Sequence, residues 1–315
     1  RLQKLLYPIA NGLLYLRSKT IPASYKESDS ILIFCSPRGG STWLAELLTT
    51  IEGYNLIWEP LHLFNNPKAK KYGFTWHNYQ NKNEENRVKE DYLNDLFEGK
   101  ELNTRTMTSL NLHVGSLINF KGLVIKFVNG NMLLPWVARR FACKKILMLR
   151  HPCAVVNSQL IFGGWKGLTK ETMTIPENLF SDFPKLKEVY DQIEHHEELL
   201  TFSWLCEAYV PMQDEEGNWL TLFYEDLVQN KESEIRKVFE YLGRDIPESA
   251  YERINKPSAT TKKDSNIAQQ KSPLEGWRTK LSQQQVDRIL HVLKMADFHL
   301  YTNALVPNKN WKQQH

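Results

Sequence analysis

The stretch "ILIFCSPRGGSTWLAELL", residues 31–48, joins an apolar, strand-like run to an apolar, helix-like run through a short polar turn. The turn holds one arginine, two glycines and two hydroxyl residues: Arg38, Gly39, Gly40, Ser41 and Thr42. The start of a helix carries unpaired N–H groups and the positive end of the macrodipole, so an anion is stabilised there. Glycines let the backbone approach an oxyanion, and arginine adds a fixed, forked charge. We therefore predict a phosphate-binding loop, with a tight glycine turn before a capped helix as the alternative.

The turn differs from the common triphosphate loop. That loop reads G-x-x-x-x-G-K-[ST], whereas this chain has no Gly-Lys-Ser/Thr and its arginine precedes the glycines. A nucleotide kinase or triphosphatase is therefore the second hypothesis rather than the first.

Short apolar runs alternate with longer helical patterns along the chain. We expect strands at Ile31–Cys35, Asn55–Trp58, Leu123–Phe127, Lys145–Leu149 and Trp219–Phe223. We expect helices at Thr42–Ile51, Met132–Phe141, Ala154–Phe162, His195–Val210, Glu232–Leu242 and Gln283–Met295. Strands separated by helices at this spacing predict an α/β fold, with a central, mostly parallel sheet flanked by helices.

The 315 residues, 42% of them hydrophobic, fit one elaborated domain. We expect that domain over residues 31–305, after an N-terminal extension over 1–30 and before a C-terminal tail over 306–315. The polar segment 65–105 is expected to be a surface insertion with one helix near Asn86–Gly99. A second polar stretch, Asn255–Lys271, is expected to form a loop that folds over a ligand.

Composition narrows the class of protein. The net charge is +4, and the longest basic block is "KAKK", Lys68–Lys71, so wrapping of a nucleic acid is not indicated. Four widely spaced cysteines favour buried free thiols over disulfides. The apolar run at the start is broken by Pro8 and Asn11 and is too short to span a bilayer. We expect a cytoplasmic protein, with a luminal enzyme trimmed from a membrane anchor as the alternative.

The stretch "SPRGGSTWLAELL" resembles the 5′-phosphosulfate loop of the sulfotransferases that use 3′-phosphoadenosine 5′-phosphosulfate (PAPS). It combines the arginine of the carbohydrate-type members with the tryptophan of the cytosolic type. The resemblance implies a P-loop-like sulfotransferase fold with PAPS as co-substrate. It implies that the 5′-phosphate and sulfonate are held by Arg38, Gly39, Gly40, Ser41 and Thr42. It also implies that Trp43 packs near the adenine, although a core position is nearly as consistent with the pattern.

The stretch "KKILMLRHPCAVVNSQL", residues 144–160, is an independent match. It resembles the family's 3′-phosphate element, which is a strand, an arginine, a turn with proline and a helix carrying a serine. In the family the arginine and serine that correspond to Arg150 and Ser158 grip the 3′-phosphate. A salt bridge at the end of a strand, beside an unrelated helix serine, is the structural alternative.

Three further elements resemble the family: "LIWEPLH" (56–62), "LFYEDLVQN" (222–230) and "EGWRTKLSQQQVDRIL" (275–290). The first is similar to a signature of the carbohydrate-type members, and the second has a structural role in the family. Taken together, the chain resembles the carbohydrate-type and bacterial members most. One departure is that "KSPLEGW", residues 271–277, stands where cytosolic members bind the 3′-phosphate with Arg-Lys-Gly. Lys262, Lys263 or Lys271 could replace those groups.

The expected reaction needs a base for the acceptor proton. Cytosolic members use a histidine at the end of a strand, and the corresponding stretch "VIKFVNGN" (124–131) keeps Lys126 but has Val128 in the histidine position. Because valine cannot accept a proton, we expect Glu59 to be the base and His62 to be the second candidate. A helix-cap or salt-bridge role is the alternative for Glu59. Arg38 and Lys126 would stabilise charge on the sulfonate and the leaving oxygen.

The resulting prediction is a sulfotransferase that moves a sulfuryl group from PAPS to the hydroxyl of a sugar, glycolipid or polar small molecule. A non-catalytic nucleotide-binding protein is a further alternative. We expect no metal ion, because His195 and His196 are adjacent on a helix and point about 100° apart. Acceptor identity is expected to depend on residues 65–105, 162–180 and 255–271, with Phe74, Trp76, Tyr79 and Trp165 as candidate lining residues. The oligomeric state is left open.

Overall fold

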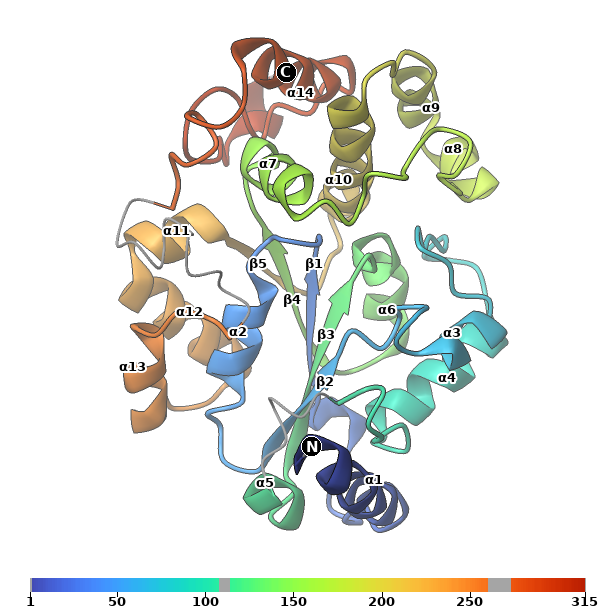
Figure 1. Ribbon diagram of the computed structural model, residues 1–315, viewed down its shortest axis with the longest axis vertical. Coiled ribbons are helices and arrows are strands. Elements are labelled where there is room, and N and C mark those ends of the chain that lie inside the picture. The colour runs from blue at the N-terminus through green and yellow to red at the C-terminus, as the bar shows by residue number, and fades with distance from the viewer. Residues whose placement is uncertain (1, 108–113, 260–272, 315) are drawn as a thin grey trace.

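A central sheet of five parallel strands organises the chain (Figure 1). The computed structural model describes residues 2–107, 114–259 and 273–314. The strands are β1 (Ile31–Cys35), β2 (Tyr54–Trp58), β3 (Gly122–Val128), β4 (Lys144–Leu149) and β5 (Leu220–Phe223). Their order in the sheet is β2-β3-β1-β4-β5. The α/β fold and all five strand positions predicted from the sequence are confirmed, with ends that differ by a residue or less.

Helices follow the strands and cover both faces of the sheet. Those of the first half are α1 (Leu2–Lys19), α2 (Ser41–Leu48), α3 (Pro67–Lys71), α4 (Arg87–Phe97), α5 (Val114–Ile118), α6 (Leu134–Arg140) and α7 (Pro152–Phe162). The later ones are α8 (Glu177–Asp182), α9 (Pro184–Asp191), α10 (His196–Gln213), α11 (Tyr224–Gln229), α12 (Lys231–Leu242), α13 (Glu248–Ile254) and α14 (Gln283–Met295). Short 3₁₀ turns lie at η1 (Glu27–Asp29), η3 (Asn131–Leu133) and η4 (Trp311–Gln314). None of the helices in these described ranges is long and apolar enough to cross a membrane.

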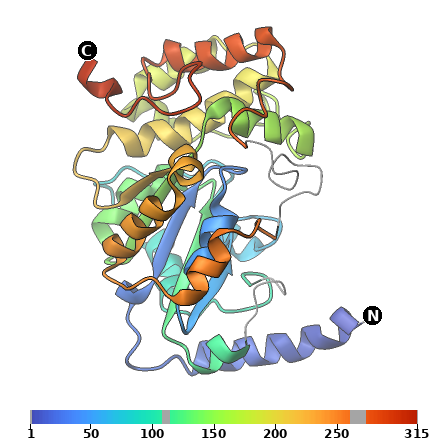
Figure 2. The same cartoon turned by 90° about the vertical axis from the view of Figure 1, so that its left-hand side faces the viewer.

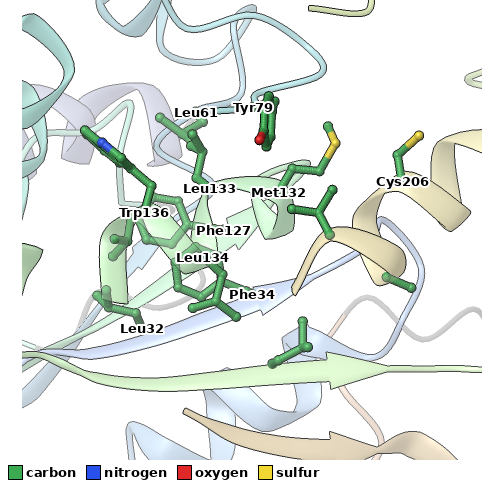
Figure 3. Close-up of a cluster of buried hydrophobic side chains, with 14 of the residues drawn as sticks. Leu32, Phe34, Leu61, Tyr79, Phe127, Met132, Leu133, Leu134, Trp136 and Cys206 are labelled. Atoms are coloured by element: carbon green, nitrogen blue, oxygen red, sulfur yellow. The ribbon is translucent and has the colours of Figure 1, made fainter. Parts of the chain in front are cut away.

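The strands are apolar throughout because both of their faces are buried. Along β1, Ile31 and Ile33 pack with α2, α12 and α13, whereas Leu32 and Phe34 pack with α4, α6 and α10. Figure 3 shows part of the second cluster, where Phe34 stacks on Phe127 of β3 with ring centres 4.9 Å apart. All four cysteines are buried, as predicted.

Residues 65–105 do more than cover the surface. The segment contains α3 as well as the expected helix α4, which carries a polar outer face and an apolar inner face. Its apolar face joins the main core through Tyr92, Leu93, Leu96 and Phe97. The helix itself was expected, but the polar composition of the segment gave no sign that its apolar face completes one layer of the fold.

Backbone strain gathers where the strands end. Among the described residues other than glycine, four have a positive φ, and three of them follow the ends of β1, β2 and β3. These are Arg38 (71°), Glu59 (45°) and Asn129 (61°). Such conformations cost roughly 1–3 kcal/mol each and cluster at functional sites. The carboxyl edge of the sheet is also where open α/β folds bind ligands.

Candidate functional site

The loop between β1 and α2 brings bare backbone to the carboxyl edge of the sheet. Gly40 precedes α2 with a φ of 104°, and no side chain caps the helix. A Cβ at Gly40 would lie 2.8 Å from the ring of Tyr224, and one at Gly39 would lie 2.4 Å from the sulfur of Cys35. Both positions therefore require glycine. The first turn of α2, which carries the hydroxyls of Ser41 and Thr42, is left for an anion.

The two motifs predicted to bind phosphate meet in space. Arg38 Nε donates a hydrogen bond to Ser158 Oγ at 3.0 Å, and Arg150 Nη1 donates one to the carbonyl of Arg38 at 3.2 Å. Burial, and then the nearby charge of Arg150, lower the pKa of Arg38. Two guanidinium groups so close together are stabilised by a bound anion.

The side chain of Arg150 packs on an aromatic ring and forms no ion pair with a carboxylate in the described part of the chain. Its guanidinium lies over the ring of Tyr224, 4.1 Å from the ring centre, and its buried Nε has no hydrogen-bond partner in the part of the chain that the structure describes. Within the same residues, no carboxylate forms an ion pair with Arg150 or Arg38. This geometry disfavours the strand-end salt bridge and leaves donors for an anionic ligand.

A buried ion pair lies beside the loop. Lys126 is almost fully buried on β3, and its Nζ donates to Glu59 Oε1 at 2.8 Å. The same Nζ lies 3.4 Å from Thr42 Oγ1 and 3.2 Å from the centre of the Trp58 ring. Burial lowers the pKa of Lys126, and the attraction of Glu59 opposes that shift. The pair connects the carboxyl ends of β2 and β3 to the first turn of α2.

Aromatic side chains line the approach to Glu59. His62 donates its backbone N–H to the carbonyl of Glu59 at 2.9 Å, and its ring meets Trp76 edge-on at 5.1 Å. Phe64 packs 5.2 Å from Trp76 and is 83% exposed. Of the other aromatic residues considered from the sequence, Trp165 lines the same cleft, whereas Phe74 and Tyr79 are buried in the core.

These groups border one open cleft of about 1370 Å³, larger than the roughly 300–1,000 Å³ typical of a single small-molecule site. Gly39 is part of the loop but does not line the cleft. The other predicted site residues within the described ranges do: Arg38, Gly40, Ser41, Thr42, Trp43, Glu59, His62, Lys126, Arg150 and Ser158. Trp43 also packs against the apolar cluster around α2. Lys262, Lys263 and Lys271 lie outside the described residues.

Sequence reasoning missed several residues that line the cleft. Trp58 and Tyr224 lie against the two key cations, and Lys256 and Lys280 add positive charge to the rim. A signal existed for the two aromatic residues, because each stands at the carboxyl end of a predicted strand. Nothing in the sequence distinguishes the two lysines from solvated ones.

The acidic residues after β5 have the structural role expected for them. Glu225 is buried and accepts hydrogen bonds from the His151 backbone N–H at 2.9 Å and the Tyr301 hydroxyl at 2.8 Å. Asp226 pairs with Lys309 at 2.6 Å. In the described part of the chain, no three His, Cys, Asp or Glu side chains gather into a group that could hold a metal ion.

Comparison with known proteins identifies the group to which this architecture is similar. The family model described as "Sulfotransferase domain" matches residues 28–290. The mouse sulfotransferase SULT7A1 complexed with PAP is 16% identical, with a TM-score of 0.44 and 91% of each chain covered. The sulfotransferase domain of the Synechococcus PCC 7002 olefin synthase is 18% identical, with a TM-score of 0.46, 89% of this chain covered and 98% of that one.

Sulfotransferase STF9 from Mycobacterium avium is 10% identical, with a TM-score of 0.45, 80% of this chain covered and 75% of that one. No curated protein sequence matches the chain significantly.

Proposed function

The chain belongs to the sulfotransferase domain family; we propose that it is a PAPS-dependent enzyme, which transfers the sulfuryl group to an acceptor hydroxyl and releases adenosine 3′,5′-bisphosphate. The observation that carries the proposal is the meeting of Arg38 with Arg150 and Ser158 in one cleft. Two anion-binding groups, one on each βα turn, suit a nucleotide with a phosphate at both ends.

The residues present fit that nucleotide. The uncapped start of α2, with Gly39, Gly40 and the hydroxyls of Ser41 and Thr42, would hold its 5′ end. The unpartnered Nε of Arg150, together with Ser158, would hold its 3′-phosphate. When bound, PAPS supplies the sulfuryl group and a bisphosphate leaving group. Trp43 would contact the adenine, and Lys262 and Lys263 stay predictions for the same site.

We assign Glu59 as the general base that takes the proton from the acceptor hydroxyl. Its carboxylate is partly exposed to the cleft and is held by Lys126 through Oε1, beside the loop where the sulfonate would lie. Lys126 and Arg38 supply positive charge to the leaving oxygen and the sulfonate, where negative charge grows as the bond to sulfur breaks. The acceptor oxygen bonds to sulfur while its proton passes to the carboxylate, so charge is conserved. His62, one turn away, is the second candidate.

The acceptor half of the cleft favours a ring that carries hydroxyls. The rings of His62, Phe64 and Trp76 offer an exposed aromatic surface next to Glu59. Such a surface suits the apolar face of a sugar, a glycolipid headgroup or a polar small molecule, and the carbohydrate-type signature at residues 56–62 agrees with it. The buried cysteines support a cytoplasmic enzyme.

Transfer of labelled sulfate from PAPS to a panel of methyl glycosides, glycolipids and small alcohols tests the proposal. We expect labelled product with at least one acceptor and release of adenosine 3′,5′-bisphosphate. A kinase or triphosphatase would instead turn over ATP and ignore PAPS. A non-catalytic protein would bind the bisphosphate tightly and transfer sulfate to no acceptor.

A further inference from the structure

Helix α1 presents an apolar face that the rest of the chain does not cover. Ile9, Leu13 and Leu16 are 62%, 40% and 60% exposed, and their spacing of four and three residues places them on one face of the helix. Leu14 lies on a different face and is buried in the main core. We call Ile9, Leu13 and Leu16 the α1 stripe. Exposed apolar groups in a row, unlike scattered ones, mark an interaction site.

Further exposed apolar side chains lie at the same end of the molecule. Tyr15 of α1 and Ile118 of α5 are also well exposed, at 64% and 73%. Arg17 joins the two helices by donating from Nη2 to the carbonyl of Ile118 at 2.9 Å. Both views show α1 beside α5 at the same end of the molecule, and α1 extends away from the body (Figures 1 and 2). Exposed apolar residues therefore occur on both helices at this end of the molecule.

The charged residues of the N-terminal sequence have one sign. The first 26 residues of the chain contain five basic residues and no aspartate or glutamate: Arg1, Lys4, Arg17, Lys19 and Lys26. A helix with an apolar stripe, tyrosine and basic residues has the composition of helices that lie in the interface of a bilayer. Each lysine or arginine near an anionic membrane adds attraction that salt screens.

We propose that α1 docks this protein on the surface of an anionic lipid bilayer, with the α1 stripe immersed and Arg17 and Lys19 of the last turn at the headgroups. A second copy fits less well, because a two-fold interface would place the same basic residues opposite one another. The helix would lie along the surface, in agreement with the finding that no described helix could span a membrane.

Docking through α1 would determine which way the cleft faces relative to the membrane. The strands run away from α1, and the phosphate loop follows the far end of β1 (Figure 1). Strand β3 is seven residues long, so the amino and carboxyl ends of the strands lie roughly 20 Å apart. The cleft would open away from the lipid, so the bound enzyme would take acceptors from the surrounding solution.

Co-sedimentation of the full chain with extruded vesicles tests the proposal. We expect binding to vesicles of phosphatidylcholine mixed with phosphatidylserine, little binding to phosphatidylcholine alone, and release at high salt. The double variant Leu13→Glu, Leu16→Glu should lower the partition coefficient at least about tenfold. Both leucine side chains are exposed and far from the cleft. The melting temperature and the nucleotide affinity of the double variant should therefore match those of the wild type.

Val88→Glu on α4 is the matched control, because Val88 is a similarly exposed apolar residue outside α1. It should bind the vesicles like the wild type. Three results would overturn the proposal: no binding of the wild type to anionic vesicles at low salt, equal binding by the double variant, or a lipid-free dimer that the double variant abolishes. If the wild type does not bind anionic vesicles, an acidic protein surface is the better partner for α1. If the double variant abolishes a lipid-free dimer, a second copy of the chain is the better partner. None of these outcomes depends on sulfate transfer, so the two proposals fail separately.

Discussion

Replacement of Glu59 by glutamine separates the chemistry of the site from its architecture. Glutamine keeps the shape of the side chain and an oxygen that can accept from Lys126, but it cannot take a proton from the acceptor. A positioned general base contributes about 10²–10⁴ in rate. We therefore expect Glu59→Gln to lower kcat by about that factor, with the affinity for adenosine 3′,5′-bisphosphate within about threefold of the wild type.

The effect on stability follows from the burial of the ion pair. The side chain of Lys126 is 2% exposed and that of Glu59 is 19% exposed, so the carboxylate is the partner that compensates a buried cation. Removal of one member of a buried pair costs about 3–5 kcal/mol, which is the expected loss for Glu59→Ala. Glutamine retains the hydrogen bond, so its cost should be nearer 1–2 kcal/mol.

The assay combines single-turnover sulfate transfer, nucleotide titration and chemical denaturation. Glu52→Gln is the control, because Glu52 is an exposed carboxylate that pairs with Lys121 away from the cleft. It should leave the transfer rate unchanged. A Glu59→Gln enzyme with nearly full turnover would refute the assignment and point to His62. A large loss of nucleotide affinity would instead show that Glu59 mainly organises the site.

Three other changes test separate parts of the account. Gly40→Ala should weaken nucleotide binding at least about tenfold, because a Cβ there would lie 2.8 Å from a tyrosine ring and the φ of 104° strains any side chain. Gly12→Ala, with open space around it, is the matched control for titration calorimetry, and equal affinities would contradict the role of the loop. Phe64→Ala should raise the KM for the acceptor and leave nucleotide affinity and melting temperature unchanged; an unaltered KM would remove the aromatic surface from the acceptor site. Burial raises the pKa of Glu207 from 4.5 to about 8, against the effect of the Asn131 N–H. The folded state therefore holds this proton more tightly, so the free energy of unfolding should fall as pH rises from about 4.5 to about 8 and should level off above that, where both states are ionised. Denaturation curves should show a weaker decline for Glu207→Gln, and identical slopes would contradict the shift.

The sequence predicted the strands and the phosphate loop because their signals are local. The short, β-branched apolar run Ile31–Cys35, followed by glycines, is typical of a strand buried on both faces that ends in a turn. Helix α4 was harder to place, since its buried residues are diluted by lysine, glutamate and asparagine. Its role became visible only when Tyr92 and Phe97 were seen in the core.

The site was predictable as two halves but not as a whole. Residue types and order indicated Arg38 and Arg150 separately, whereas the hydrogen bond from Arg38 to Ser158 spans 120 positions. Contacts at that separation depend on the order of strands in the sheet. For the same reason, the sequence does not show that the Trp58 ring lies against Lys126, or that the Nε of Arg150 has no hydrogen-bond partner among the described residues.

The most direct test of the central claim compares the affinities of two nucleotides for two proteins. The account assigns a 3′-phosphate to Arg150, so the wild type should bind adenosine 3′,5′-bisphosphate far more tightly than adenosine 5′-phosphate. Loss of charge-assisted hydrogen bonds worth about 1.5–3 kcal/mol should weaken the bisphosphate about 10–100-fold in Arg150→Ala. The affinity for adenosine 5′-phosphate should change by less than about threefold. Equal losses for both nucleotides would contradict the two-phosphate site.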